Sequence, residues 1–215
     1  MTRTANDRIL VCFALKEEAA PFLRALPAGV ETLVTGMGAA AAERAATAKL
    51  VERKWGLVLT CGFAGGLNPA LRPETVVFEA DADFPLHHAL LEAGAVAGRF
   101  HCAERVAGTA AEKTALRERT GADAVEMESG IIRRLCHARG LPSATVRVIS
   151  DAAHEDLPLD FNPLMQADGT LHLGKLAGAI LCRPHKIPAL LALGRRSKSA
   201  AQRLAAVLRV VLASS

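Results

Sequence analysis

The stretch Ala124–Asp151 constrains the fold most, because its pattern predicts a strand, a helix, a turn and a second strand in direct succession. Ala124–Met127 is a short apolar run, and beyond it apolar side chains recur at helical spacing. Gly140 and Pro142 end that helix. Thr145–Ser150 is apolar and β-branched, which is typical of a buried strand in an α/β protein.

Three carboxylates, those of Glu126, Glu128 and Asp151, lie at or near the carboxyl ends of these two strands. Ligands of open α/β sheets bind at that edge. Two of the acids also have simple structural explanations, because Glu128 can stabilise a helix start beside a capping Ser129 and Asp151 can open a loop. Met127 between two acids is harder to explain by capping, so together these residues predict a polar ligand.

The motifs VEMES and RVISD, in this order, resemble the purine nucleoside phosphorylase and nucleosidase superfamily, especially its methylthioadenosine/S-adenosylhomocysteine nucleosidases. The resemblance implies a single α/β domain, a three-layer α/β/α arrangement with a central mixed β-sheet. It implies that Glu128 binds ribose hydroxyls, Met127 packs on the sugar and Asp151 protonates the purine. Glu126 and Ser150, within the same motifs, are also expected to bind substrate.

An N-terminal strand, Arg8–Leu15, is followed by Lys16 and two acids that begin a helix. The helix dipole stabilises acids in a first turn, which explains them without a function. The family signature here, A-x-E-E-E after a strand, implies instead a water-activating glutamate. It falls on Glu18, with Glu17 as the alternative if the register slips by one.

A glycine-containing turn, Gly36-Met37-Gly38, separates the predicted strand Glu31–Gly36 from the predicted helix Ala39–Arg53. G-x-G between a strand and a helix can indicate dinucleotide binding, but the third glycine of that motif is missing. The turn resembles the family's G-x-G-x-x-x-A, which implies that Met37 faces a 5′ substituent on the ribose.

A second glycine turn follows the predicted strand Leu57–Phe63 and resembles the family's G-[ST]-A-G-G-L. The resemblance implies that Gly62 and Phe63 line the substrate, although Phe63 stands where a small hydroxyl residue is usual. Thr60 stands where phosphorylases of the superfamily carry a phosphate-binding arginine. The missing cation favours water over phosphate as the nucleophile.

The middle of the chain has weaker patterns. The expected elements are a strand at Thr75–Ala80, an irregular and shortened loop at 81–101, a strand at Arg105–Gly108 and a helix at Ala110–Arg119. Lys113 is expected on the outer face of that helix. Phe161 resembles an aromatic residue that covers the 5′ substituent in the family, but it can equally fill the core.

A chain of 215 residues with 51% hydrophobic and 22% charged residues has the composition of one globular domain. The N-terminal residues lack the apolar core of a signal peptide, so we expect a cytoplasmic protein. The five cysteines and seven histidines show no metal-ligand spacing, so we expect no metal. We also expect no cofactor, a small nucleoside as the partner, and a homodimer.

Positive charge is concentrated near the C-terminus. Eight of the 26 lysines and arginines but none of the 22 acids follow Asp168, so residues 1–168 carry a formal charge of −4. The pattern over about 171–215 predicts a basic helical extension, divided at Pro184–Pro188 and carrying an apolar stripe. The stripe favours packing on the chain's own domain. A looser resemblance to hopanoid-associated phosphorylases implies instead an anionic membrane surface and a lipid-linked substrate.

The implied reaction is hydrolysis of the N-glycosidic bond of a purine nucleoside, with adenine as the expected base and a 5′ substituent on the ribose. Asp151, at a buried and apolar strand end, is expected to hold the proton for the base. Glu18, in a wetter place, is expected to stay ionised and bind the attacking water. Two alternatives are phosphorolysis and non-catalytic binding of a nucleoside or lipid at a membrane surface. Nucleic-acid binding is disfavoured, because only 4% of the residues are aromatic.

Overall fold

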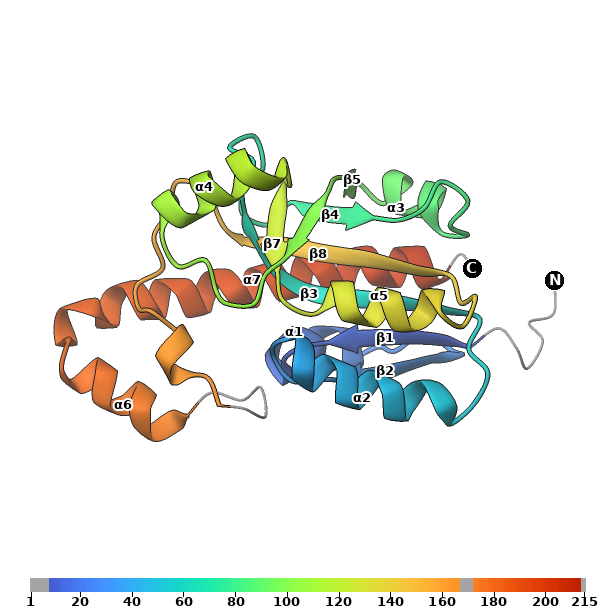
Figure 1. Cartoon of the computed structure of the whole chain (residues 1–215), viewed down its shortest axis with the longest axis horizontal. Coiled ribbons are helices and arrows are strands. Elements are labelled where there is room, and N and C mark those ends of the chain that lie inside the picture. The colour runs from blue at the N-terminus through green and yellow to red at the C-terminus, as the bar shows by residue number, and fades with distance from the viewer. Residues whose placement is uncertain (1–7, 167–171, 214–215) are drawn as a thin grey trace.

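One mixed β-sheet with helices on both faces forms the body of the protein in the computed structural model, which describes residues 8–166 and 172–213 (Figure 1). The strands are β1 (Ile9–Phe13), β2 (Val30–Val34), β3 (Leu57–Gly66), β4 (Val76–Glu79), β5 (Val96–Ala97), β6 (Phe100–Cys102), β7 (Ala124–Glu126) and β8 (Ser143–Asp151). The helices are α1 (Lys16–Leu23), α2 (Ala39–Val51), α3 (His87–Glu92), α4 (Ala110–Thr120), α5 (Ser129–His137), α6 (Leu173–Leu181) and α7 (Ile187–Ala213). Two short 3-10 turns are η1 (Asn162–Leu164) and η2 (Pro184–Lys186).

The strands lie in the order β2-β1-β3-β8-β4-β5, with β7 and β6 beside the far end of β3. The first four strands of this order are parallel, whereas β4 runs antiparallel to β8. The register between β3 and β8 shifts between Ala64 and Gly65, and the last two residues of β3 pair antiparallel with β7. The expected central mixed sheet is therefore confirmed, and β3 links its two regions.

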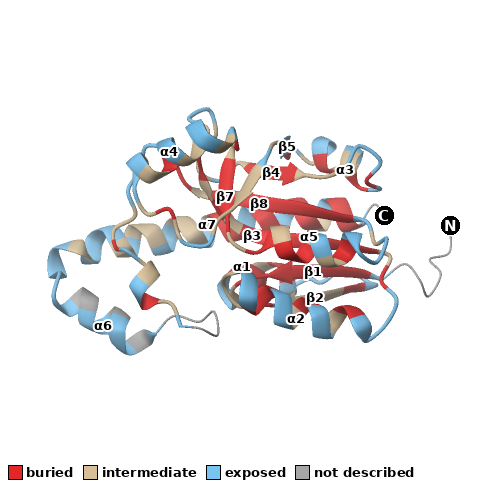
Figure 2. Ribbon diagram, in the orientation of Figure 1, coloured by how far each residue is buried: buried red, intermediate tan, exposed pale blue. Residues whose placement is uncertain are grey.

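Alternate residues of the central strands face two separate helical layers, as Figure 2 shows by the buried strands between partly exposed helices. On β1, Val11 and Phe13 belong to a buried cluster that includes Phe22 of α1 and Leu208 of α7. Leu10 belongs to a second cluster, formed with α2 and α5. The sequence requirement for this arrangement is a strand that is apolar at every position, and β1, ILVCF, meets it.

Two predictions for the middle of the chain are wrong. The stretch 81–101 is not an irregular loop, because it contains α3, β5 and the start of β6. Arg105–Gly108 is not a strand, because its backbone groups bind a loop further along the chain. The Val106 amide donates to Asn162 Oδ1 at 2.8 Å, and the Gly108 carbonyl accepts from the Leu157 amide at 2.7 Å.

The C-terminal helices divide at Pro184–Pro188 as predicted, but the division between domain and extension lies later. Residues 200–212 of α7 supply Leu204, Leu208 and Val211 to the main core, so they are part of the domain. α6 and the first turns of α7 project from the body (Figure 1). Residues 171, 214 and 215 of the expected extension lie outside the described residues. Within the described ranges, none of the helices has the length and apolarity needed to cross a bilayer.

Candidate active site

Glu18 lies in the first turn of α1, directly after β1, and its carboxylate binds three backbone amides. Oε2 accepts hydrogen bonds from Ala14 at 3.0 Å and Leu15 at 2.9 Å, and Oε1 accepts one from Phe63 at 2.8 Å. The carboxylate therefore stabilises the start of its own helix and ties it to β3. Glu17 is exposed, so of the two candidates only Glu18 belongs to this cluster.

A buried arginine on β8, Arg147, gathers two further carboxylates. Nη2 donates to Glu126 Oε2 at 2.6 Å and to Glu128 Oε2 at 3.1 Å. Arg147 is 2% exposed, so these ion pairs are shielded from solvent. We assigned it no role from sequence, although a lone arginine within the apolar run Thr145–Ser150 indicates buried acids nearby.

Gly62 allows Glu18 and Arg147 to meet against the backbone of β3. A Cβ atom at this position would lie 2.7 Å from Glu18 Oε1 and 2.8 Å from Arg147 Nη1. The φ angle of Gly62 is +144°, which other residues rarely adopt. Both constraints require glycine, so the predicted involvement of Gly62 has a physical basis in the close approach of two charged groups.

Glu126 and Glu128 have different surroundings, although only Met127 separates them. Glu126 accepts from the amides of Glu128 and Ser129 at 3.0 and 2.7 Å and from the Ser129 hydroxyl at 2.7 Å. Ser129 is the first residue of α5 and binds Glu126, so the expectation that it caps the helix is wrong. Glu128 Oε1 accepts from the Gly38 amide at 2.8 Å and has lone pairs left for a ligand. Glu126 instead holds the motif in shape.

The apolar side chains expected beside the sugar and its 5′ substituent are only partly brought together. Met127 Cε lies 3.9 Å from the position that a Cβ of Gly38 would occupy, so the E-M-E motif and the glycine turn are neighbours. Met37, Met127 and Phe63 are each partly exposed. Phe161 is also partly buried, and it precedes η1, which binds the loop before α4 through Asn162.

Burial controls the protonation of this cluster. It raises the pKa of Glu18 to about 7, against the opposing effects of Arg147 and the amides of Phe63 and Leu15. It also raises the pKa of Glu128, again against Arg147. Burial alone would lower the pKa of Arg147, but the surrounding carboxylates outweigh it and raise that pKa. The expectation of a wet, fully ionised Glu18 is therefore wrong, because the side chain is 3% exposed.

Asp151, at the end of β8, has a partner that we did not predict. Its Oδ1 lies 2.5 Å from Ser150 Oγ, and its Oδ2 accepts a hydrogen bond from Lys113 Nζ on α4. Lys113, expected on the outer face of its helix, is instead 0% exposed. The prediction is wrong because the loop after β8 folds against α4 and offers the carbonyls of Ala152 and Glu155 to the ammonium. The environment of Asp151 is thus an ion pair rather than an apolar strand end.

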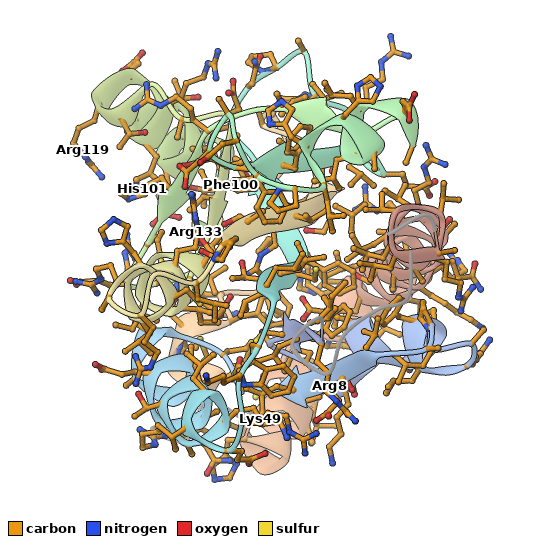
Figure 3. The ribbon with its side chains drawn as sticks, turned by 90° about the vertical axis from the view of Figure 1, so that its right-hand side faces the viewer. Arg8, Lys49, Phe100, His101, Arg119 and Arg133 are labelled. Atoms are coloured by element: carbon orange, nitrogen blue, oxygen red, sulfur yellow. The ribbon has the colours of Figure 1, made fainter. Side chains whose placement is uncertain are left out.

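A separate hollow of about 410 Å³ lies between α5 and β6 and is lined by none of the predicted site residues. Phe100 and Arg133 belong to its walls and lie close together in Figure 3. Arg133 is paired with Glu79 at 3.1 Å and Asp81 at 3.6 Å, so its charge is already engaged within the hollow. Among the described residues, no group of three or more His, Cys, Asp or Glu side chains is placed to hold a metal ion.

Comparison with known proteins finds similarity in both sequence and fold. The family model described as "Phosphorylase superfamily" matches residues 77–182, and no curated protein matches the chain in sequence. Futalosine hydrolase of Helicobacter pylori is 17% identical, with 98% of this chain and 99% of that chain covered and a TM-score of 0.71. The 5′-methylthioadenosine/S-adenosylhomocysteine nucleosidase of Neisseria meningitidis, solved with methylthio-immucillin-A, is 19% identical, with coverage of 97% and 100% and a TM-score of 0.71.

The corresponding nucleosidase of Helicobacter pylori, solved with butyl-thio-DADMe-Immucillin-A, is 16% identical, with 99% and 100% of the two chains covered and a TM-score of 0.72. At these identities the likeness shows a shared fold, which extends over nearly the whole chain. The family model adds a likeness in sequence over the segment from β4 to the end of α6, which contains the two motifs VEMES and RVISD. Residues 77–182 thus match the phosphorylase superfamily, and nearly the whole chain has the fold of these nucleosidases.

Proposed function

We propose that this enzyme hydrolyses the N-glycosidic bond of a purine nucleoside. The observation that carries the proposal is the meeting of Glu18, Arg147 and Glu128 at Gly62, on the strand that also pairs with Asp151. Cleavage of this bond gives the sugar carbon oxocarbenium character. It needs a base for the attacking water, a group that binds the sugar and a proton for the leaving purine. The cluster supplies a carboxylate for each task.

Glu18 is assigned the role of general base. Its pKa of about 7 leaves it substantially ionised at neutral pH and basic enough to accept a proton from water. Glu128 is assigned the ribose hydroxyls, because its oxygens retain acceptor capacity. Asp151, with Ser150 beside it, is assigned the protonation of the leaving purine. This division of roles needs no metal and no organic cofactor.

Hydrolysis is favoured over phosphorolysis because the described cluster offers no free cation to bind phosphate. Arg147 is already bound by two glutamates, so within the described cluster it is not available to a phosphate dianion. Thr60 lies in the middle of β3, between Cys12 of β1 and Thr145 of β8, and is fully buried. It offers phosphate neither a charge nor an exposed hydroxyl.

The substrate is proposed to carry adenine and a 5′ substituent. The partly exposed Met37, Met127 and Phe63 support an apolar group beside the sugar. Two substrates in the name of one structurally similar protein, 5′-methylthioadenosine and S-adenosylhomocysteine, contain adenosine, and the first carries a named 5′ substituent.

The deciding experiment incubates the enzyme with 5′-methylthioadenosine, S-adenosylhomocysteine, futalosine, adenosine and inosine, with and without phosphate. We expect free base and free sugar without added phosphate. Asp151→Asn should release base ~10²–10⁴-fold more slowly, the range for lost general-acid catalysis. A sugar 1-phosphate that forms only with phosphate would establish phosphorolysis, and no base release from any nucleoside would establish a binding protein.

The projecting arm, residues 172–199, is proposed to hold the enzyme at an anionic membrane surface, where a lipid-linked 5′ substituent resides, as in the hopanoid-associated phosphorylases. Its cations Lys175, Arg183 and Arg195 are exposed, as are Leu181 and Leu191, at 83% and 59%. Each cation near such a surface contributes up to about 1 kcal/mol, and salt weakens the effect. We also propose that the enzyme is a homodimer, which light scattering tests. Its proposed location is the cytoplasm, which cell fractionation tests.

Truncation is not a clean test of the arm, because residues 200–212 belong to the core. Charge reversal of Lys175, Arg183 and Arg195 to Glu leaves the core intact. We expect the wild type to sediment with anionic liposomes at low salt and the triple variant to remain in solution. A control triple variant reverses exposed cations of the body, Lys54, Arg72 and Arg119. Equal sedimentation of both variants with the wild type would exclude the arm as the membrane contact.

A further inference from the structure

The Lys113 ammonium is fully buried, and each of its three protons has an acceptor. Nζ donates to Asp151 Oδ2, to the Ala152 carbonyl at 2.9 Å and to the Glu155 carbonyl at 2.8 Å. An ammonium group has three donors and no acceptor, so this set of partners matches the charged form of lysine. A lysine that only filled space on a helix would not need three convergent acceptors.

The surroundings make Lys113 the counter-charge of Asp151. Beside the pair, the Glu155 carboxylate accepts hydrogen bonds from the Ala152 amide at 3.2 Å and from Arg196 at 3.0 and 3.1 Å. The exposed His154, together with Arg196, helps to lower the pKa of Glu155. Arg196 is thus engaged by Glu155, and among the described residues Lys113 is the cation that contacts Asp151.

The pair lies against β3, further along the strand from Glu18. A Cβ at Gly65 would lie 3.4 Å from Asp151 Oδ2 and 3.8 Å from Lys113 Cε. Asp151 is 5% exposed, so water does not supply its proton freely. An aspartate held as a carboxylate by an ammonium cannot by itself be the acid that the leaving base requires.

We propose that Lys113 supplies the proton that the leaving base receives, with Asp151 as the relay. This inference rests on the proposed nucleosidase function. Lys113 acts through Asp151 and does not touch the substrate, so it is a positioning residue rather than a catalytic one.

The protons and electrons balance in the following way. The C1′–N bond breaks, and its electron pair stays on the purine, which takes a proton from the Asp151 carboxyl. That carboxyl proton originates on Lys113 Nζ, which is left as a neutral amine. Water adds to C1′ and gives its proton to Glu18. After the products leave, water in the emptied site returns a proton to Lys113 through Asp151 and removes one from Glu18.

The hydrogen bonds around Lys113 tolerate this change of charge. After the transfer, the amine keeps two N–H groups for the carbonyls of Ala152 and Glu155. Its new lone pair faces the protonated Asp151. While the proton is on Asp151, no buried polar atom loses a partner, so the first transfer leaves no unsatisfied group. Once the purine has taken the proton, the Asp151 carboxylate faces a neutral amine, which favours reprotonation of Lys113 after the products leave. Arginine could hold the same charge but could not release the proton.

The test uses Lys113→Arg and Lys113→Met in the full chain, with Arg119→Met as a control on the exposed side of the same helix. We expect Lys113→Arg to lower kcat about 10²-fold at pH 7 with KM changed less than about threefold. For Lys113→Met, a buried carboxyl without its counter-charge favours the protonated form, so Asp151 can act as the acid unaided at low pH but not once a rising pH has removed its proton. Its loss of kcat relative to the wild type should therefore grow from about 10-fold at pH 5 to at least about 10²-fold at pH 8.

A merely structural lysine would give a loss independent of pH, and near-normal kcat in Lys113→Arg would overturn the proton relay. A smaller loss at pH 8 than at pH 5 would contradict it too. If Lys113→Met does not fold, as judged by circular dichroism, Lys113→Gln retains two N–H donors and replaces it. Failure of the wild type to release any base would instead overturn the proposed function, so the two failures are distinguishable.

Discussion

The backbone amide of Phe63 donates a hydrogen bond of 2.8 Å to Glu18 Oε1. In the sequence, Phe63 departs from the small hydroxyl residue usual at this place, which put the local geometry in question. The structure answers that question, because the group that holds Glu18 is the main chain. Substitution of the side chain leaves this contact in place.

Phe63→Ser should therefore retain catalysis. We expect kcat within about 10-fold of the wild type, since the Phe63 amide still binds Glu18. Stability should fall by about 1–3 kcal/mol, less than the 3–5 typical of a fully buried phenylalanine, because the side chain is only partly buried. Steady-state kinetics and urea unfolding check the two expectations. A loss of kcat as large as that of Glu18→Gln would show that the ring itself is essential.

The raised pKa of Glu18 predicts the acid side of the pH–rate profile. A general base must be ionised, so kcat/KM should increase as the pH rises through about 7. Glu18→Gln removes the base and should lower kcat by ~10²–10⁴-fold and abolish this rise. Binding of substrate, measured by calorimetry, should change little. A rise centred near pH 4.5 in the wild type would contradict the assignment.

The same pKa predicts the pH dependence of stability. The pKa of Glu18 is raised from 4.5 to about 7 on folding, so its favourable contribution is complete below 4.5 and lost as the pH rises through about 7. Glu18→Gln carries no charge at either end of this range. The stability of the wild type relative to this variant should thus fall by roughly 3 kcal/mol between pH 4.5 and 8. Urea unfolding at both pH values measures the difference, and a constant difference would contradict burial of an ionisable Glu18.

Gly62→Ala should disable the site. The new methyl group would overlap Glu18 Oε1 and Arg147 Nη1, and the φ angle of +144° is strained for alanine. We expect a loss of at least about 2 kcal/mol in stability together with loss of activity. Gly194→Ala is the matched control, because no atom lies within 4 Å of its added methyl and it lies in α7. It should be neutral or stabilising by about 0.5–1 kcal/mol. Normal activity in Gly62→Ala would disprove the close approach.

Glu128→Gln should alter selectivity for the sugar. A hydrogen bond from a hydroxyl to a charged acceptor contributes about 1.5–3 kcal/mol, so the preference for ribosides over 2′-deoxyribosides should fall roughly 10–100-fold. Competition between adenosine and 2′-deoxyadenosine measures the ratio of kcat/KM directly. Ser129→Ala, which alters the Glu126 side of the motif, is the control and should leave the ratio unchanged. Equal losses for both sugars in Glu128→Gln would place the ribose elsewhere.

Local patterns predicted the elements that carry the site but not the charges that complete it. The succession of β7, α5 and β8 was readable, because apolar periodicity, Gly140 and Pro142 define it. Arg147 was readable in principle, since a charge inside an apolar strand requires a buried partner. Lys113 was not, because it shares a helix with exposed charges. Its burial depends on residues 152–155, which lie about 40 positions later in the chain.

The secondary structure predicted for the middle of the chain was wrong for a similar reason. β5 and β6 contain two and three residues, and their pairing partners are β4 and β7. Such short strands are defined by neighbours that are distant in the sequence, so a local pattern gives little signal. The unpredicted burial of Glu18 and the unpredicted ion pair of Asp151 have the same origin, because both depend on residues distant in the sequence.

The packing of α7 determines when this protein can finish folding as it is made. Phe22 of α1 shares its core with Leu208 and Val211, so one side of the sheet stays uncovered until α7 has left the ribosome. β1, β3 and β8 would expose apolar side chains throughout that interval. Such contacts between distant parts of a chain form slowly and leave intermediates prone to aggregation. The nascent protein is thus expected to depend on chaperones until α7 has emerged from the ribosome.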